Sequence, residues 1–206
     1  MNVNTDAMEL VVGKGRVNFI TKNADGTTNQ FNHFGTQKGD ARWCKILEAD
    51  EYDKYTVDVY GDLEHIQAEA EAIVEKAKEL VEGAGKEIEK VQYATKTNKE
   101  GEEFVHFKRD AFKRDGTENT PPKIYNSAGT LVEGWNKLIG NGSKVSVAYL
   151  LSPYYMASSK TVGVSIKFYA IQVIDLVEYS GGGGGSPFDN ESGEDVPFSD
   201  DGDSEY

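Results

Sequence analysis

Two long stretches in the second half of the chain alternate between apolar and polar residues, a pattern typical of β-strands. They are Lys144–Leu151 and Val162–Tyr179, and a short connector separates them. Apolar residues occupy every second position at Val145, Val147 and Tyr149, and again at Val164, Ile166 and Phe168. The second stretch is too long for one flat strand, so we expect a bend or a bulge near Gly163 or Ala170.

One segment has the pattern of an amphipathic helix. Apolar residues recur every three or four positions from Leu63 to Val81. Asp62 is placed to cap the helix start, and Gly83 and Gly85 are placed to end it. We expect the charged residues of the segment to face solvent, namely Glu64, Glu71, Glu75, Lys78 and Glu82.

Shorter alternating segments complete the pattern. Strands are predicted at Leu10–Val12, Arg16–Thr21, Tyr55–Tyr60 and Glu102–Arg109, whereas Ala41–Leu47 fits a strand or a short helix and Thr27–Gly39 fits a loop. Five or more strands with one helix fit a mainly β fold, a five-stranded Greek-key barrel of the OB type over residues 1–180. The pattern alone leaves a generic α+β domain open.

The last residues differ sharply in composition. Ser180–Ser186 reads SGGGGGS, which is typical of a flexible linker. Residues 181–206 carry eight acidic residues and no Lys or Arg, so we expect a disordered acidic tail. The tail residues that suit partner binding are Phe198, Asp200, Asp201, Asp203, Glu205 and Tyr206.

The uneven charge changes how the net charge is interpreted. The 206 residues have a formal net charge of −13, which argues against nucleic-acid binding. Without the tail, 22 basic residues face 27 acidic ones, so one face can still be basic. The single cysteine, Cys44, excludes an intrachain disulfide. With no leader pattern and no apolar run of membrane-spanning length, we expect a cytoplasmic protein without a membrane partner.

Three segments combine cations with aromatic rings, the two groups that hold single-stranded nucleic acid. The first is Phe104–Arg114, with Phe107, Lys108, Arg109, Phe112, Lys113 and Arg114 as candidates. The second is the connector Pro153–Met156 with the strands around it, which offers Tyr154, Tyr155, Lys144, Lys167 and Tyr169. The third is Trp43 between two cations. An equally good interpretation of the first segment places the Phe rings in the core, and a buried Trp43 is as plausible as a stacking one.

Catalytic signals are weak. The three histidines are scattered, and neither paired cysteines nor a His-x-x-x-His spacing suggests a metal site. No phosphate loop, nucleophile elbow or dinucleotide fingerprint is present. We therefore expect no enzyme, no metal and no cofactor.

The order of several short motifs resembles a known family. Gly142-Ser143-Lys144, Pro153-Tyr154, Val162-Gly163 and Val177-Glu178, followed by a Gly-rich acidic tail, are similar to the C-terminal core of the single-stranded DNA-binding proteins of T-seven-like bacteriophages. The resemblance implies an OB barrel that coats single-stranded DNA during replication, recombination and repair, with Tyr154 in the binding site.

The same resemblance implies partners and a location. The acidic tail would recruit a replicative DNA polymerase or a primase-helicase, and tail exchange would be compatible with a homodimer in the host cytoplasm. Family tails end in Phe, whereas the last residue here is Tyr206.

Two other functions fit the same residues. An acidic OB-like module could bind a basic protein partner or mimic nucleic acid, with its aromatic residues in the core. An RNA-binding OB domain is the other alternative, because nothing in the sequence reports on the 2′-hydroxyl.

Overall fold

The two alternating stretches form the longest hairpin of the computed structural model, which describes residues 3–13 and 16–178. Strand β10 (Ser143–Met156) pairs antiparallel with β11 (Thr161–Asp175). The segment Pro153–Met156, expected to be a connector, instead continues β10. Its residues pair with Thr161–Val164, so that part of the prediction is wrong because the turn lies later, at residues 157–160.

The expected irregularity in β11 lies beside Ala170. Ala148 faces Ala170 and Tyr149 faces Phe168, which leaves Tyr169 as the extra residue of a bulge. At Gly163 the pairing is continuous. Gly163 lacks a side chain for another reason, since a Cβ there would lie 2.8 Å from the Tyr154 hydroxyl.

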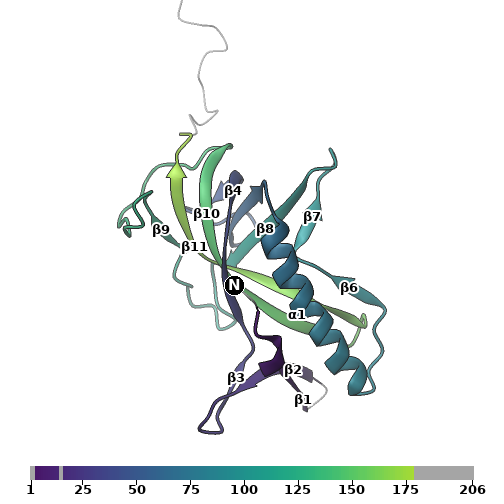
Figure 1. The fold of residues 1–206 in the computed structure, drawn as a ribbon. Coiled ribbons are helices and arrows are strands. Elements are labelled where there is room, and N and C mark those ends of the chain that lie inside the picture. Colours follow the sequence, from purple (N-terminus) through teal and green to yellow (C-terminus); the bar gives the residue numbers. More distant parts are fainter. Residues whose placement is uncertain (1–2, 14–15, 179–206) are drawn as a thin grey trace, which may run out of the picture.

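Five strands close into a barrel (Figure 1). Strands β4 (His33–Lys45), β5 (Lys54–Tyr60) and β8 (Glu103–Asp110) follow β10 in the order β11-β10-β4-β5-β8. A parallel contact between Lys167 of β11 and Lys108 of β8 completes the ring. The chain therefore has the Greek-key OB barrel that the pattern predicted.

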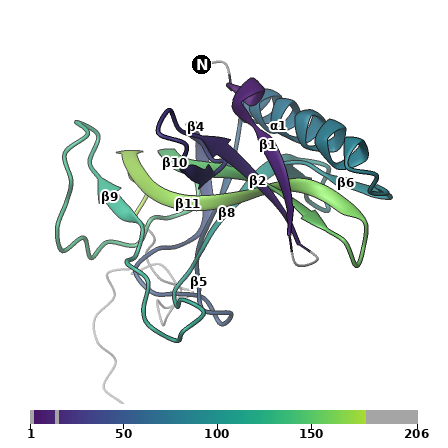
Figure 2. The ribbon, with the colours of Figure 1, turned by 90° about the horizontal axis from the view of Figure 1, so that it is seen from below.

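The amphipathic segment forms α1 (Glu64–Gly83), which packs against β4, β10 and β11. Figure 2 shows α1 beside the barrel, close to the N-terminal strands. The cap position of α1 is Leu63, which has no side-chain cap hydrogen bond, so the predicted cap at Asp62 is one residue too early. The Asp62 carboxylate does accept a hydrogen bond of 3.1 Å from the backbone N–H of Glu64, the first helical residue. The buried face of α1 consists of Ile66, Glu69, Ala70, Ile73, Val74, Ala77 and Val81.

Glu69 is the exception on that face. Only 4% of it is exposed, and its carboxylate accepts the Tyr149 hydroxyl at 2.5 Å. The same carboxylate lies 2.8 Å from His33 Nε2 and 3.2 Å from His65 Nε2. A buried carboxylate needs such partners to offset its lost hydration. The contacts with Tyr149 of β10 and His33 of β4 fix α1 to the barrel, whereas the contact with His65 lies within α1.

Shorter elements surround the barrel. A 3₁₀ turn (Thr5–Ala7) precedes a separate three-stranded sheet of β1 (Glu9–Gly13), β2 (Arg16–Lys22) and β3 (Thr28–Gln30). Strands β6 (Lys90–Gln92), β7 (Thr95–Thr97) and β9 (Lys123–Tyr125) extend the barrel sheet. The loop predicted at Thr27–Gly39 is wrong, because β3 and the first half of β4 occupy it and pair with β2 and β10.

The barrel interior is apolar. Its largest fully buried side chains include Phe107, Tyr149, Phe168 and Leu151. Within the described ranges, no helix is long and apolar enough to cross a membrane. The expected acidic tail, with Phe198, Asp200, Asp201, Asp203, Glu205 and Tyr206, lies outside the described residues.

Candidate nucleic-acid interface

A groove runs along the junction of β8 and β11 on the outside of the barrel. It consists of two hollows that share Lys108, Ser165 and Ile166. One hollow is completed by residues of β6, β7, β8, β10 and β11 and of the β6–β7 connection, namely Gln92, Tyr93, Ala94, Lys96, His106, Tyr154, Met156 and Val164. The other is completed by Arg109, Asp110, Asn119, Leu150, Lys167, Phe168 and Tyr169. We call this continuous surface the β8–β11 groove.

Strand alternation decides which residues reach the groove. Val105 and Phe107 of β8 point into the barrel and are 0% exposed, so Lys108 between Phe107 and Arg109 points outward. The prediction that Phe107 contacts DNA is therefore wrong, because its ring is a core residue that packs 5.7 Å from the Tyr149 ring.

The groove is rich in cations that lack carboxylate partners. Among the described residues, no Asp or Glu oxygen lies within 4.0 Å of the charged atoms of Lys96, Lys108, Arg109 or Lys167. The Nε atom of Arg109 is buried and also has no hydrogen-bond partner there. The acidic lining residue is Asp110, which is paired with Lys54 at 2.5 Å.

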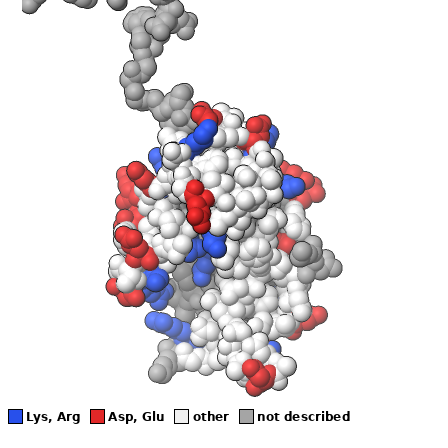
Figure 3. All heavy atoms as spheres, turned by 90° about the vertical axis from the view of Figure 1, so that its left-hand side faces the viewer, with Lys and Arg blue, Asp and Glu red and all other residues white. Residues whose placement is uncertain are grey.

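Space-filling Figure 3 draws one face of the molecule. On it, several Lys and Arg side chains lie near the centre and at the lower left, an acidic side chain lies just above the central ones, and other Asp and Glu side chains lie mostly toward the edges. Charge is therefore unevenly distributed over this face, which a single net value does not convey.

Aromatic rings accompany the cations. Tyr169 is 44% exposed and meets Phe34 edge to face, with ring centroids 5.8 Å apart and planes at 85°. Phe34 is itself 51% exposed. At the other end of the groove, Tyr93 is 46% exposed. Exposed rings beside unpaired cations provide stacking surfaces next to phosphate-binding groups.

Tyr154 is held in a defined orientation. Its hydroxyl donates a hydrogen bond to the Gln92 side-chain oxygen, and its ring passes over Gly163. Burial raises the pKa of Tyr154, so the phenol is neutral at physiological pH. A neutral, oriented ring can offer its face or its hydroxyl to a ligand without repelling phosphate.

The other predicted residues lie elsewhere. Tyr155, the next residue of β10, packs against the core and donates its hydroxyl to the Glu87 carbonyl at 2.8 Å. Phe112, Lys113 and Arg114 are exposed in the turn that follows β8, outside the two hollows. Lys144 is ion-paired with Asp40. Trp43 lines a separate hollow, described below.

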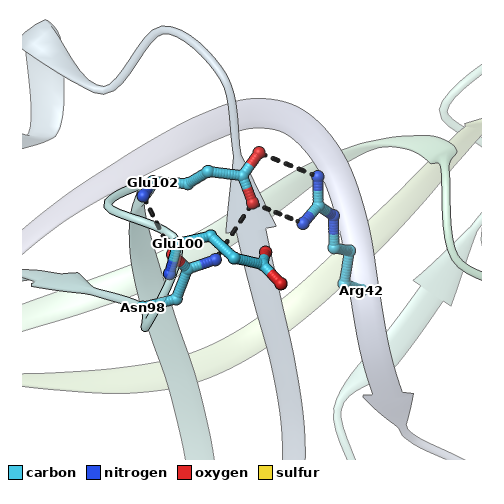
Figure 4. Close-up of polar contacts among 4 residues, drawn as sticks. All are labelled: Arg42, Asn98, Glu100 and Glu102. Atoms are coloured by element: carbon cyan, nitrogen blue, oxygen red, sulfur yellow. Dashed lines mark hydrogen bonds and ion pairs between the residues drawn. The ribbon is translucent and has the colours of Figure 1, made fainter.

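A further cation on the barrel exterior is already neutralised (Figure 4). Arg42 of β4 lies 4.0 Å over the Tyr60 ring and binds Glu102 through Nη1 at 2.8 Å. Asn98 donates to the same carboxylate at 3.0 Å. The hydrogen bond from Arg42, and to a smaller extent the one from Asn98, lowers the pKa of Glu102. The Arg42–Glu102 pair therefore stays charged. Arg42 is therefore occupied, whereas the groove cations are not.

Several groove residues escaped the sequence reasoning. Phe34, which contacts Tyr169, lies in the segment Thr27–Gly39 that was predicted to be a loop, and Tyr93 and Lys96 lie in a part of the chain for which no strand was predicted. His106 lies 2.5 Å from Asp58 on the neighbouring strand. The available signal was an aromatic residue in an otherwise polar stretch, which marks Phe34 and Tyr93 alike.

Other chemistry has little support here. Residues 3–13 and 16–178 contain no cluster of three or more His, Cys, Asp or Glu that could hold a metal ion. Burial raises the pKa of Cys44 to about 12, so its thiol is protonated at neutral pH.

Comparison with solved structures bears on the fold. The crystal structure of gp2.5, a single-stranded DNA binding protein encoded by bacteriophage T7, matches with a TM-score of 0.54 and 21% identity, covering 81% of this chain and 100% of that chain. The chain shares the fold of a phage single-stranded DNA-binding protein. The resemblance inferred from the sequence is thus confirmed at the level of the fold.

More distant matches are the single-stranded DNA-binding protein of bacteriophage Enc34 and its complex with single-stranded DNA. Their TM-scores are 0.40 and 0.41, with 12% and 13% identity. They cover 85% and 84% of this chain, and 94% and 98% of their own. No protein-family model matches the sequence, and no curated protein matches it.

Proposed function

We propose that this protein binds single-stranded DNA in the β8–β11 groove and has no catalytic activity. One observation carries the proposal. The groove combines cations that lack carboxylate partners among the described residues, such as Lys108 and Lys167, with the exposed ring of Tyr169. The T7 protein that shares the fold is named a single-stranded DNA binding protein, which supports the same ligand.

The cations and the aromatic rings of the groove would have different roles. Lys96, Lys108, Arg109 and Lys167 would neutralise phosphates, which makes binding sensitive to salt. The Tyr169–Phe34 pair would stack on bases, at about 1–3 kcal/mol for each stacked base. Base faces are available only in an unpaired strand, so the groove would discriminate against duplex DNA.

We further propose a role in phage DNA replication, recombination or repair inside the host cell. A binder without sequence readout suits the coating of exposed single strands. The acidic tail, with Phe198 and the acids up to Glu205, would recruit a replicative polymerase or a primase-helicase. Support for this part comes from the tail composition and from the family resemblance.

The binding test is a fluorescence titration of the full-length protein with labelled oligo-dT, RNA of the same length and a duplex. We expect tight, salt-sensitive binding to oligo-dT and weak duplex binding. Tyr169→Ala should weaken oligo-dT binding about 5- to 150-fold, the loss that corresponds to one stacking contact of about 1–3 kcal/mol. Tyr52→Ala is the matched control, because Tyr52 is 71% exposed but lies outside the groove.

Each outcome has a defined meaning. No binding to any of the three nucleic acids would refute the proposal and favour the acidic module that binds a basic protein. Tighter binding to RNA than to oligo-dT would show that the ligand is RNA and not single-stranded DNA. The tail role is tested separately, since Phe198→Ala should abolish capture of the polymerase or helicase and leave oligo-dT affinity unchanged.

A further inference from the structure

A third hollow, which shares no lining residue with the β8–β11 groove, lies at the end of β4. Its volume is about 450 Å³, and its lining comprises Trp43–Glu48 together with Leu138, Ile139 and Asn141. Its most exposed apolar lining residues are Trp43 at 68% and Leu138 at 47%, and Ile46 and Ile139 below them are each 5% exposed. An apolar hollow with an exposed tryptophan at its rim is typical of a docking site.

The backbone holds Trp43 in its exposed position. The pairing of β4 with β5 shifts register between Arg42 and Lys45, which marks a bulge that contains Trp43. Trp43 has φ of +53°, an unfavourable value for a large side chain. The Asn141 side-chain oxygen accepts the Trp43 backbone N–H at 2.9 Å and fixes this conformation. Strain maintained by a specific contact points to a functional position.

The described chain ends at the rim of this hollow. Glu178 forms a β-bridge with Ile139, one of the lining residues. The Gly140 N–H donates to the Val177 carbonyl at 2.8 Å, and Lys137 is ion-paired with Glu178. Glu178, the last described residue, therefore lies beside the apolar surface.

We propose that this hollow binds Pro187-Phe188 of the same chain. About ten residues, mostly Gly and Ser, separate Glu178 from Phe188. A Gly-rich chain of about that length spans roughly 16–19 Å on average, enough to bring Phe188 back to a surface that begins at Glu178. A short linker also gives a millimolar effective concentration, so even a weak site is occupied.

The charge pattern distinguishes this element from the other Pro-Phe pair. Within four residues, Phe188 has only Asp189 and Glu191, whereas Phe198 has Glu194, Asp195, Asp200 and Asp201. The hollow has one lining cation, Lys45, and one lining acid, Glu48, so it has no surplus charge for a denser acidic segment. Docking of Pro187-Phe188 leaves Pro197-Phe198 accessible to other proteins.

The experiment reads out the accessibility of Trp43 in the full chain. Trp135→Phe leaves Trp43 as the single tryptophan, and acrylamide quenching of its fluorescence reports how far it is covered. With a site affinity near the effective concentration, about half the molecules are docked, so Phe188→Ala raises the quenching constant about twofold. Leu138→Asp produces the same rise, and Phe198→Ala is the matched control that leaves it unchanged. If Trp135→Phe does not fold, fluorotryptophan NMR of the Trp135-containing chain resolves the two indoles.

The controls separate the alternative occupants. Docking within one chain gives a quenching constant that does not depend on protein concentration, whereas occupation by a second copy makes it fall as the concentration rises. Unchanged quenching in Phe188→Ala overturns the proposal. Protection of Trp43 by oligo-dT, without any effect of Phe188→Ala, would assign the hollow to DNA instead. Oligo-dT affinity of Phe188→Ala is measured in parallel, because the docking site and the β8–β11 groove are independent.

Discussion

The salt dependence of DNA binding is the sharpest test of the β8–β11 groove. The perturbation is Lys108→Gln or Lys167→Gln, which removes the charge and retains most of the aliphatic side chain. Both lysines are exposed, face each other across the β8–β11 junction and have no carboxylate within 4.0 Å among the described residues. Each is therefore available for one phosphate.

The magnitude follows from counting charges. For single strands, each neutralised phosphate contributes about 0.7 to the slope of log affinity against log salt concentration. The four groove cations, Lys96, Lys108, Arg109 and Lys167, give a slope of about −2.8. Such a slope means a loss of about 50-fold in affinity between about 50 and about 200 mM salt. Each single substitution should flatten the slope by about 0.7, and the double substitution by about 1.4.

The assay is a series of oligo-dT titrations over that salt range. Lys78→Gln is the control, because Lys78 is on α1 and is ion-paired with Glu75 at 2.9 Å. It should leave the slope unchanged. If the control flattens the slope as much as Lys108→Gln does, the charge acts from a distance and the groove is not the phosphate track. If neither groove substitution changes the slope, the phosphates lie elsewhere on the surface.

Three further predictions concern residues that shape the groove or the fold. Gly163→Ala should cost about 1–3 kcal/mol of stability and weaken oligo-dT binding, because the new methyl group would lie 2.8 Å from the Tyr154 hydroxyl. Cys44→Ala should flatten the fall of stability above pH 9. Burial raises the pKa of the folded thiol to about 12. Between about pH 9 and about pH 12 only the unfolded chain therefore releases the thiol proton, and the free energy of unfolding drops by about 1.4 kcal/mol per pH unit. Tyr149→Phe should cost about 1.5–3 kcal/mol in denaturant unfolding, because the buried Glu69 carboxylate loses a donor.

Matched variants make these predictions decisive. Gly13→Ala is the control for Gly163→Ala, because, apart from its chain neighbours, no atom of the described residues lies within 4 Å of a Cβ at Gly13. If Gly13→Ala loses as much oligo-dT affinity as Gly163→Ala, the contact with Tyr154 is not the cause of the loss. Tyr155→Phe removes a hydrogen bond to a neutral carbonyl and should cost less than Tyr149→Phe. For Cys44, identical pH profiles of the variant and the parent protein would show that the thiol does not titrate in this range.

Local periodicity predicted most of the main elements but not their full extent or their pairing. The alternation in Lys144–Leu151 and Val162–Tyr179 predicted most of the main hairpin, and apolar residues every three or four positions after Leu63 predicted α1, whereas the first half of β4 was predicted as a loop. Alternation also determines that Phe107 and Lys108 point to opposite sides. It does not say which side is the interior when both faces carry apolar residues, and Phe107 was assigned to the wrong one.

The groove itself depends on contacts between distant segments. Lys108 and Lys167 become neighbours only when the barrel closes, and Tyr93 reaches them through β6, which pairs with β11. Phe34 meets Tyr169 because a bulge in β11 leaves Tyr169 unpaired. Such long-range register is set by packing of the whole barrel, so Tyr154, Lys108, Arg109, Lys167 and Tyr169 could be proposed singly but not as one surface.

The net charge of −13 is compatible with an anionic ligand because charge acts locally in salt. The Debye length is about 8 Å at physiological ionic strength, so a phosphate in the groove interacts mainly with the charges of its immediate surroundings. Among the described residues, eight Lys and Arg are engaged by carboxylates, as Lys54 is by Asp110 and Arg42 by Glu102. The groove cations are among those left unengaged, and eight of the acids belong to the tail. The groove brings four of these unengaged cations together beside exposed aromatic rings, and such a local cluster can bind a polyanion whatever the sign of the total charge.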